Sequence, residues 1–243
     1  MELTILHLYP DLMDLYGEYA NLSVLRRRLE GLGVSVAIAG CAPEAAPDFA
    51  SADLIYMGAG TERRQKYALT ALLPHADALK AAAERGAAVL FTGNAMETLG
   101  ASVTDASGKV WQGLGLADFT TVETDKRSPG DVVAVPVLWD APAVGFMNKC
   151  STTRGIAAPL FSQLTLGFGN EAEHGAEGYV SGNVFATHIT GPVLVKNPAF
   201  LDFLTRRLFE CRGWDLPEEL LPLPHQREAY AVTLSELQKR IGG

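Results

Sequence analysis

Short apolar runs alternate with segments of helical periodicity along the first hundred residues. Runs of this length that end at glycine or polar residues are typical of strands covered on both faces. Helical segments between such strands predict a doubly wound, mostly parallel sheet. The predicted strands are residues 3–9, 34–40, 52–60 and 87–93, and the predicted helices are 19–33 and 66–86. The first helix is expected to have Asn21 as N-cap and to stop at Gly31 or Gly33, and the second to break near Pro74.

The pattern changes after residue 100. A hairpin is predicted over 103–115, with Ser107 and Gly108 at its turn. Further strands are predicted over 131–139, 162–170 and 182–191. A strong helix covers 197–213, with Asn197 as N-cap and Pro198 in the first position.

Residues 215–243 differ from the rest of the chain in their pattern of apolar and polar positions. We expect one domain over residues 1–214 and a C-terminal extension over 215–243, which is proline-rich at first and then helical. In 225–241, four apolar residues fall at helical spacing: Tyr230, Leu234, Leu237 and Ile241. We expect this face to pack on its own domain rather than on a partner.

Composition narrows the class of protein. The chain has 243 residues, 48% of them hydrophobic and 20% charged, which indicates a folded globular protein. A net charge of −8 disfavours nucleic-acid binding, and no apolar run is long enough for membrane insertion. Three widely spaced cysteines (Cys41, Cys150 and Cys211) indicate a reducing compartment without a disulfide framework or metal site. With no signal-peptide pattern at residue 1, a cytoplasmic protein is expected.

Two turns after predicted strands are candidate sites. Gly58, Ala59 and Gly60 end one strand, and the exposed N–H groups of such a turn can hold an anion or oxyanion. The sequence VLFTGNAMETLG (89–100) predicts a strand, a sharp turn at Gly93-Asn94 and a helix, the arrangement that often presents a nucleophile. From spacing alone, both are more often plain turns that need glycine.

Two single residues are weaker candidates. His188 lies in FATHITGP near the end of a predicted strand, where a histidine can be a general base. Cys150 lies beside Lys149 and close to Arg154, and nearby cations can lower a thiol's pKa. An ordinary buried histidine and an ordinary thiol are the commoner explanations.

Taken together, several stretches resemble one family. They are LTILHLYPDLMDLYGEYANLSVLRRR, DLIYMGAGTERRQ, VLFTGNAMETLG, GKVWQGLGLADFTTVETDKRSPGDVV, VGFMN, LGFGN and HITGPVLVKNPAFLDFLT. The chain resembles the class I glutamine amidotransferases of the cobyric acid synthase (CobB/CobQ) type, and among them the glutaminase subunits of lipid II isoglutaminyl synthase. The resemblance runs from residue 1 to about residue 240.

The resemblance implies a three-layer α/β/α, flavodoxin-like fold. It implies hydrolysis of glutamine through a thioester on an elbow cysteine, with a histidine as base. It places the ligand- and oxyanion-binding groups at Gly58, Ala59, Gly60, Asn94, Arg127 and Asn148. It also implies a heterodimer with an ATP-dependent subunit similar to Mur ligases, which uses the ammonia to amidate a peptidoglycan precursor, and it implies no cofactor.

The chain departs from the family at both catalytic positions. With Leu99-Gly100 as the anchor, Gly93 stands where the family has its cysteine, and Thr190 where it has its histidine. His188 lies two residues earlier, about 7 Å along a strand, too far for an unshifted pair. Glu97 replaces the family's glutamine on the elbow helix. Loss of such a unit costs on the order of 10⁴- to 10⁶-fold in rate.

Three hypotheses follow, in order of preference. The first is a subunit that has lost glutaminase activity and acts as a binding or regulatory partner of a Mur-ligase-like protein. The second is an active enzyme with a rearranged site, which uses Cys150, paired with His188, or a chemistry other than thioester formation. The third is a sensor that binds glutamine or a related amino acid without turnover.

Overall fold

A six-stranded sheet forms the centre of the molecule, seen in a computed structural model that describes residues 1–216, 220 and 223–241. The strand order is β10-β11-β4-β3-β1-β2, and every neighbouring pair is parallel except β10 with β11. The mostly parallel central sheet expected from the sequence is therefore confirmed. The strands are β1 (Glu2–Leu8), β2 (Ser35–Cys41), β3 (Leu54–Met57), β4 (Ala88–Thr92), β10 (Tyr179–Ser181) and β11 (Val184–Thr187).

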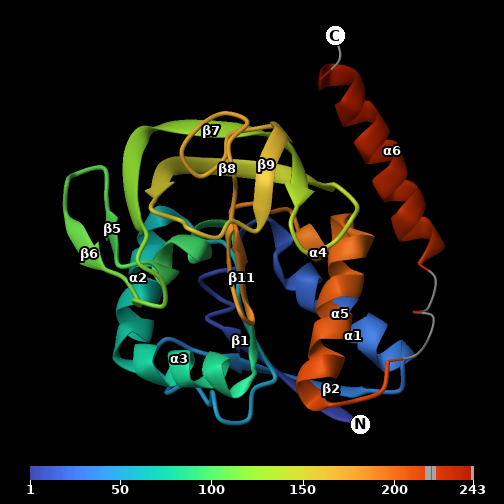
Figure 1. Cartoon of the computed structure of the whole chain (residues 1–243). Coiled ribbons are helices and arrows are strands. Elements are labelled where there is room, and N and C mark those ends of the chain that lie inside the picture. Colours follow the sequence, from blue (N-terminus) through green and yellow to red (C-terminus); the bar gives the residue numbers. More distant parts are fainter. Residues whose placement is uncertain (217–219, 221–222, 242–243) are drawn as a thin grey trace.

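Helices cover both faces of this sheet and make the fold three-layered (Figure 1). One face packs on α1 and α5, and the opposite face on α2 and α3. Side chains alternate between the two cores along β3: Leu54 and Tyr56 belong to one, Ile55 and Met57 to the other. The helices are α1 (Tyr19–Gly31), α2 (Glu62–Leu72), α3 (Ala76–Arg85), the short α4 (Val193–Lys196) and α5 (Pro198–Arg212).

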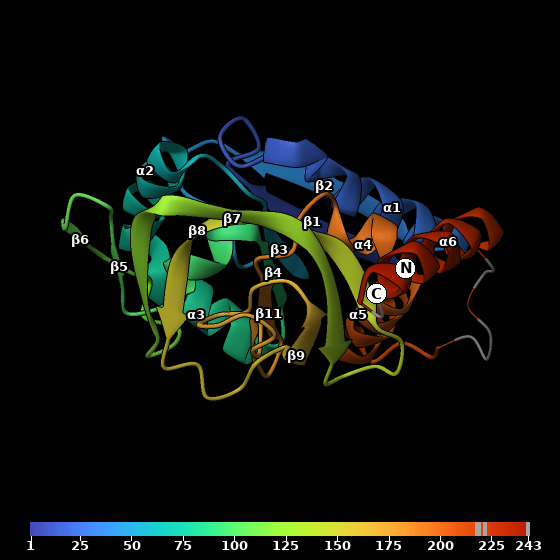
Figure 2. The same ribbon diagram turned by 90° about the horizontal axis from the view of Figure 1, so that it is seen from above.

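A second sheet lies above the ends of the central strands, as the two views in Figures 1 and 2 agree. Its strands run in the order β6-β5-β7-β8, and β9 also pairs with β7. They are β5 (Ser102–Thr104), β6 (Val110–Gln112), β7 (Thr120–Pro136), β8 (Ala143–Arg154) and β9 (Phe161–Leu166). The hairpin predicted over 103–115 is β5 and β6, with Gly108 at a positive φ of 87°.

The asparagines predicted as N-caps of two helices both use their side chains for other contacts. Asn21 is not the N-cap of α1, because Glu18 occupies that position. Asn21 is buried inside the helix, donates to the Tyr56 hydroxyl (2.9 Å) and accepts from Leu194 N (2.8 Å). Asn197 is the N-cap of α5 with Pro198 in the first position, as predicted, but its side chain bonds the backbone of Val144 and makes no capping hydrogen bond. In both cases the polar side chain forms hydrogen bonds with a distant part of the chain instead of capping the helix.

The C-terminal helix α6 (Pro224–Ile241) packs on the second sheet. Leu237 is buried against Val133 and Val144, with Tyr230 and Leu234 partly buried beside it. The expectation that this face packs on its own domain is confirmed for these three residues of α6, whereas Ile241 is exposed. Part of the proline-rich stretch before α6 lies outside the described residues. Figure 1 shows the C-terminal half of α6 extending past the rest of the molecule.

Candidate functional site: an elbow without a nucleophile

The turn after β4 has the geometry of a nucleophile elbow. Gly93 follows the strand directly and has a positive φ of 61°, a conformation that non-glycine residues rarely adopt. A 3-10 helix, η3 (Gly93–Leu99), follows, so the predicted helix is present in a tighter form. A side chain at this position would be presented at the carboxyl end of the central sheet, where open α/β sheets bind ligands.

The space that the Cβ of a side chain at position 93 would occupy is already filled. A Cβ added at Gly93 would lie 2.5 Å from the Cβ of Ala59 and 2.9 Å from Cγ2 of Thr190. Contacts below 3 Å between carbon atoms are strongly repulsive, so a cysteine there would force its neighbours to move. Thr190 also donates its hydroxyl to the Phe146 carbonyl at 3.1 Å, which holds the side chain in place. The two replaced positions therefore lie side by side and fit each other tightly.

The glycine turn over 58–60 is joined to the elbow by a pair of hydrogen bonds. Gly60 N donates to Oδ1 of Asn94 (3.0 Å), and Nδ2 of Asn94 donates back to the Gly60 carbonyl (2.9 Å). The Gly60 N–H is thereby satisfied within the protein instead of pointing at a ligand. The structure brings these predicted residues together, with Asn94 acting as a clamp between the two turns.

A pocket of about 210 Å³ opens beside the elbow. Most of the residues predicted for the site reach it, including Arg127, Asn148, Cys150 and His188. Its full lining is Leu15, Tyr16, Ala59, Gly60, Thr61, Glu62, Gly93, Asn94, Glu97, Glu123, Arg127, Asn148, Lys149, Cys150, His188 and Thr190. The cavity beside Gly93 is large enough for a small molecule.

His188 lies buried at this pocket between two carboxylates. Its Nδ1 is 3.0 Å from Oε1 of Glu177, which also accepts the His188 backbone N–H at 2.8 Å. Its Nε2 is 3.4 Å from Oε1 of Glu97, but the two atoms are not aligned as a hydrogen bond. Burial alone would raise the pKa of both carboxyl groups, but His188 and the hydroxyl donors around them hold both pKa values below the ordinary range.

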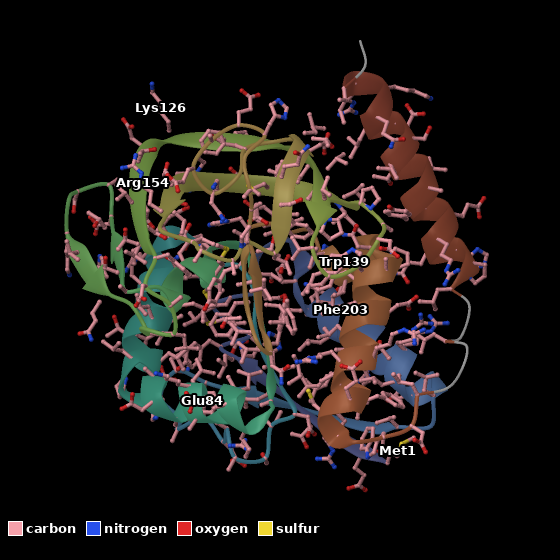
Figure 3. The ribbon with its side chains drawn as sticks, in the orientation of Figure 1. Met1, Glu84, Lys126, Trp139, Arg154 and Phe203 are labelled. Carbon is pink, nitrogen blue, oxygen red and sulfur yellow. The ribbon has the colours of Figure 1, made fainter. Side chains whose placement is uncertain are left out.

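Cys150 has the surroundings of an unreactive thiol. Burial and the neighbouring Glu62 raise the pKa of its thiol to about 12, and Sγ lies 3.5 Å from Oε1 of Glu62. Arg127 lowers that pKa only in part, because its guanidinium pairs with the same carboxylate at 2.6 Å. Arg154 points away to the surface near Glu171, and Figure 3 shows it at the outer end of the upper sheet. A thiol that stays protonated is a weak nucleophile.

Two buried lysines complete the polar lining of the cavity region. Lys149 donates from Nζ to the Gly169 carbonyl at 2.5 Å, and burial lowers its pKa to about 8. Lys66 forms an ion pair with Glu123 in which both side chains are almost fully buried. Both lysine cations are thus removed from water and held by oxygen acceptors.

Glu18 and Glu177 are site residues that the sequence did not reveal. Glu18 is fully buried beneath the elbow, where it contacts the Thr92 hydroxyl, accepts from Tyr56 (3.0 Å) and accepts from Gly191 N (3.0 Å). Burial raises the pKa of its carboxyl group. Glu177 lies in a loop without periodicity. Glu18 could have been noticed as an acidic residue within the first stretch that resembles the family. Nothing in the sequence around Glu177 marked it as a site residue.

Two searches for other kinds of site gave no candidates. No cluster of three or more His, Cys, Asp or Glu residues suited to a metal ion occurs among the residues that the structure describes. In the same described part of the chain, no helix combines the length and the hydropathy needed to cross a bilayer.

Comparison with known proteins shows which family the chain belongs to. A sequence profile of the CobB/CobQ-like glutamine amidotransferase domain matches residues 4–198. The chain belongs to this family. Its solved structural neighbours include a glutamine amidotransferase (TM-score 0.53, 13% identity, 86% of this chain and 98% of that one). They also include a glutamine amidotransferase from Thermotoga maritima (TM-score 0.51, 10% identity, 99% and 94% covered). These likenesses show the same fold.

Within the CobB/CobQ-like amidotransferases, the chain is similar to two GatD proteins. It is 30% identical over 230 residues to the GatD subunit of lipid II isoglutaminyl synthase (glutamine-hydrolyzing) of Staphylococcus aureus (strain N315), with 95% of this chain and 93% of that protein covered. It is 29% identical over 199 residues to the subunit of the same name from Streptococcus pneumoniae (strain ATCC BAA-255 / R6), with 81% and 76% covered. The family and fold expected from the sequence are both confirmed.

Proposed function

We propose that this CobB/CobQ-like amidotransferase does not hydrolyse glutamine and serves as a non-catalytic subunit of a complex that amidates a lipid II-type precursor. The two similar GatD proteins are subunits of lipid II isoglutaminyl synthases, which supports the setting. The observation that carries the loss of activity is the contact set at Gly93, where even a Cβ lies 2.5 Å from Ala59 and 2.9 Å from Thr190. A cysteine at this position would have to displace Ala59 or Thr190.

The remaining groups do not support a rearranged thioester mechanism. The Cys150 thiol is the only cysteine in the pocket lining, and its pKa is raised rather than lowered. Its described side-chain hydrogen bond goes to Glu62, while His188 faces Glu177 and Glu97. A base that does not reach the thiol cannot take its proton.

The test is an ammonia-release assay on purified protein with glutamine as substrate. We expect release at the background rate, with no further decrease in Cys150→Ala. The triple variant Ala59→Gly, Gly93→Cys and Thr190→His serves as a gain-of-function comparison, because it reopens the space and restores both lost groups. Release by the unmodified chain that Cys150→Ala abolishes would show a rearranged glutaminase and refute the proposal.

The partner is proposed to be an ATP-dependent protein similar to Mur ligases, with which this chain forms a heterodimer. Affinity capture of the tagged chain from its source cell, followed by mass spectrometry, tests this part. We expect an ATP-binding ligase among the captured proteins, in the same amount with the Gly93→Ala variant as bait if that variant folds. Capture without any ligase in repeated experiments would count against the heterodimer.

A third candidate, amino-acid sensing, is favoured by one observation. Arg127 and Glu62 form an ion pair at the pocket lining and could hold a carboxylate and an amine. Titration of glutamine or glutamate by calorimetry tests this reading, and absence of heat with both ligands removes it.

A further inference from the structure

We propose that the floor of the elbow pocket binds a primary ammonium group, supplied by the ammonium ion or by a small organic amine. The inference rests on the proposed function, because it takes the pocket as a site without a thiolate. It assigns to His188 and Glu97 the role of ligands for a cation. The site would bind a nitrogen compound from solution, whereas an active glutaminase makes ammonia in place.

The first observation is an unsatisfied nitrogen on a buried residue. His188 is 2% exposed and lines the pocket, and its Nε2 has no hydrogen-bond partner among the described residues. The other ring nitrogen faces the Glu177 carboxylate at 3.0 Å, which holds the ring proton at Nδ1. In the neutral ring Nε2 is then an acceptor. A buried acceptor left unpaired costs free energy, which a ligand with an N–H donor would recover.

The second observation is a buried carboxylate next to that nitrogen. Glu97 is 2% exposed and lines the same pocket. Ser151 donates to its Oε1 (2.5 Å) and Gln65 to its Oε2 (2.7 Å), so the carboxylate is held in one orientation. Oε1 lies 3.4 Å from Nε2 of His188, a spacing at which one nitrogen donor can reach both acceptors. The pair is thus oriented before any ligand arrives.

A third acceptor lies on the same lining. Nδ2 of Asn148 donates to the Tyr16 hydroxyl at 2.9 Å, while its Oδ1 is buried and has no partner among the described residues. The unsatisfied atoms of the pocket are therefore acceptors. A ligand that satisfies them must be rich in donors.

Charge favours a cation over a neutral amide. Ser151 and Gln65 both donate to the Glu97 carboxylate, and donors of this kind favour its charged form. Hydrogen bonds in which the donor or the acceptor is ionised are about twice as strong as neutral ones, and a cation also gains the direct attraction between opposite charges. Among the described residues there is no cluster of three or more His, Cys, Asp or Glu that could hold a metal ion. The cation of Lys149, which lines the same pocket, is engaged by the carbonyl oxygens of Gly169 and Asn170.

The experiment compares ammonium chloride with potassium chloride at equal ionic strength, by calorimetry on the full-length chain. Potassium has a similar size and the same charge but no N–H donors. We expect saturable heat with ammonium, with methylammonium or with both, and only dilution heat with potassium. Heat with ammonium alone identifies the free ion as the source, and heat with methylammonium and ornithine alone identifies an organic amine.

Variants and a spectroscopic signal locate the site. Glu97→Gln should weaken binding by about tenfold or more, because a charged acceptor is lost. Glu62→Gln is the matched control: it removes one carboxylate from the same lining without touching His188, and should change binding much less. In protein labelled with ¹⁵N-histidine, the Nε2 signal of His188 should shift on addition of the amine. A Cys150→Ala control should retain that shift.

Three results would overturn the inference. They are equal heats with ammonium and potassium, unchanged binding in a folded Glu97→Gln variant, or heat with glutamine but with no amine. The ammonium and potassium comparison uses the unmodified chain and does not depend on the folding of a variant. Glutaminase activity would refute the proposed function, whereas absence of amine binding in an inactive protein would refute this inference alone.

Discussion

At the scale of single residues, Gly93, Ala59 and Thr190 behave as one packed unit. The positive φ of Gly93 suits glycine, and the methyl groups of the other two fill the space above it. A substitution at any one of them is therefore expected to change the packing of the other two.

We predict that Gly93→Cys destabilises the protein and restores no glutaminase activity. The added side chain meets Ala59 and Thr190 at distances that require atoms to move. Overpacking of this kind lowers the free energy of unfolding by about 1–3 kcal/mol. Urea denaturation measures the loss. Combination with Ala59→Gly should recover part of it, and a Gly93→Cys variant as stable as the parent would contradict the tight fit.

Lys149 gives a prediction about pH. Its pKa falls from 10.5 to about 8 on folding, so the unfolded chain binds more protons between those two pH values. Stability contributed by this residue therefore rises with pH through that window, by up to ~3 kcal/mol. Below about pH 8 the cost of burying the cation is fully present.

The comparison with Lys149→Met measures this effect. The free energy of unfolding of the parent, minus that of the variant, should be more favourable at pH 10 than at pH 7. Other titrating groups are common to both proteins and cancel in the difference. A difference that stays constant with pH would show that Lys149 keeps its ordinary pKa in the folded state.

Single residues could be predicted as site residues only where the neighbouring sequence marked them. Gly93 and the turn at Gly58 were found because a strand followed by glycine constrains the backbone locally. Glu177 was missed, since only the folded chain brings its loop to His188. The tight fit between Ala59 and Thr190 was equally invisible, because these residues are separated by 131 positions and meet only through Gly93.

At the scale of elements, β8 shows why a functional strand is hard to recognise. In this part of the sequence Asn148 and Cys150 were candidate site residues, and no strand was predicted over Ala143–Arg154, where β8 lies. Its polar residues Lys149, Ser151 and Thr153 are buried with their side chains in hydrogen bonds, so the strand lacks the apolar alternation that marks other strands. Five strands of the central sheet were predictable because they are apolar runs that end at glycine or polar residues, whereas the short edge strand β10 was not predicted.

The element α6 carries a prediction of its own. Leu237 is 5% exposed and packs on Val133 and Val144, so Leu237→Ala should lower the free energy of unfolding by about 2 kcal/mol. Arg240→Ala, which breaks an exposed ion pair with Asp131, should change it much less and is the matched control. Chemical denaturation of both variants decides this, and equal small effects would show that α6 is only loosely attached.

At the scale of the whole molecule, the chain has the fold of the CobB/CobQ-like amidotransferases, with Gly93 packed against Ala59 and Thr190 at its elbow. The pocket lies where the elbow after β4, the glycine turn and β8 meet. The pocket has acceptors that are held in fixed orientations. We therefore expect it to bind a small ligand.

A reconstituted complex with the proposed ligase-like partner provides the last prediction. Because this chain lacks a thiolate, amidation of the precursor should proceed with an ammonium salt as nitrogen source and should not proceed with glutamine. Product formation is followed by mass spectrometry with ¹⁵N-ammonium or with glutamine labelled at the side-chain nitrogen. Glu97→Gln should raise the ammonium concentration needed for half-maximal rate, and Glu62→Gln should not. Efficient transfer of label from glutamine would mean that the complex contains a working glutaminase site, and the proposed non-catalytic role of this chain would then be wrong.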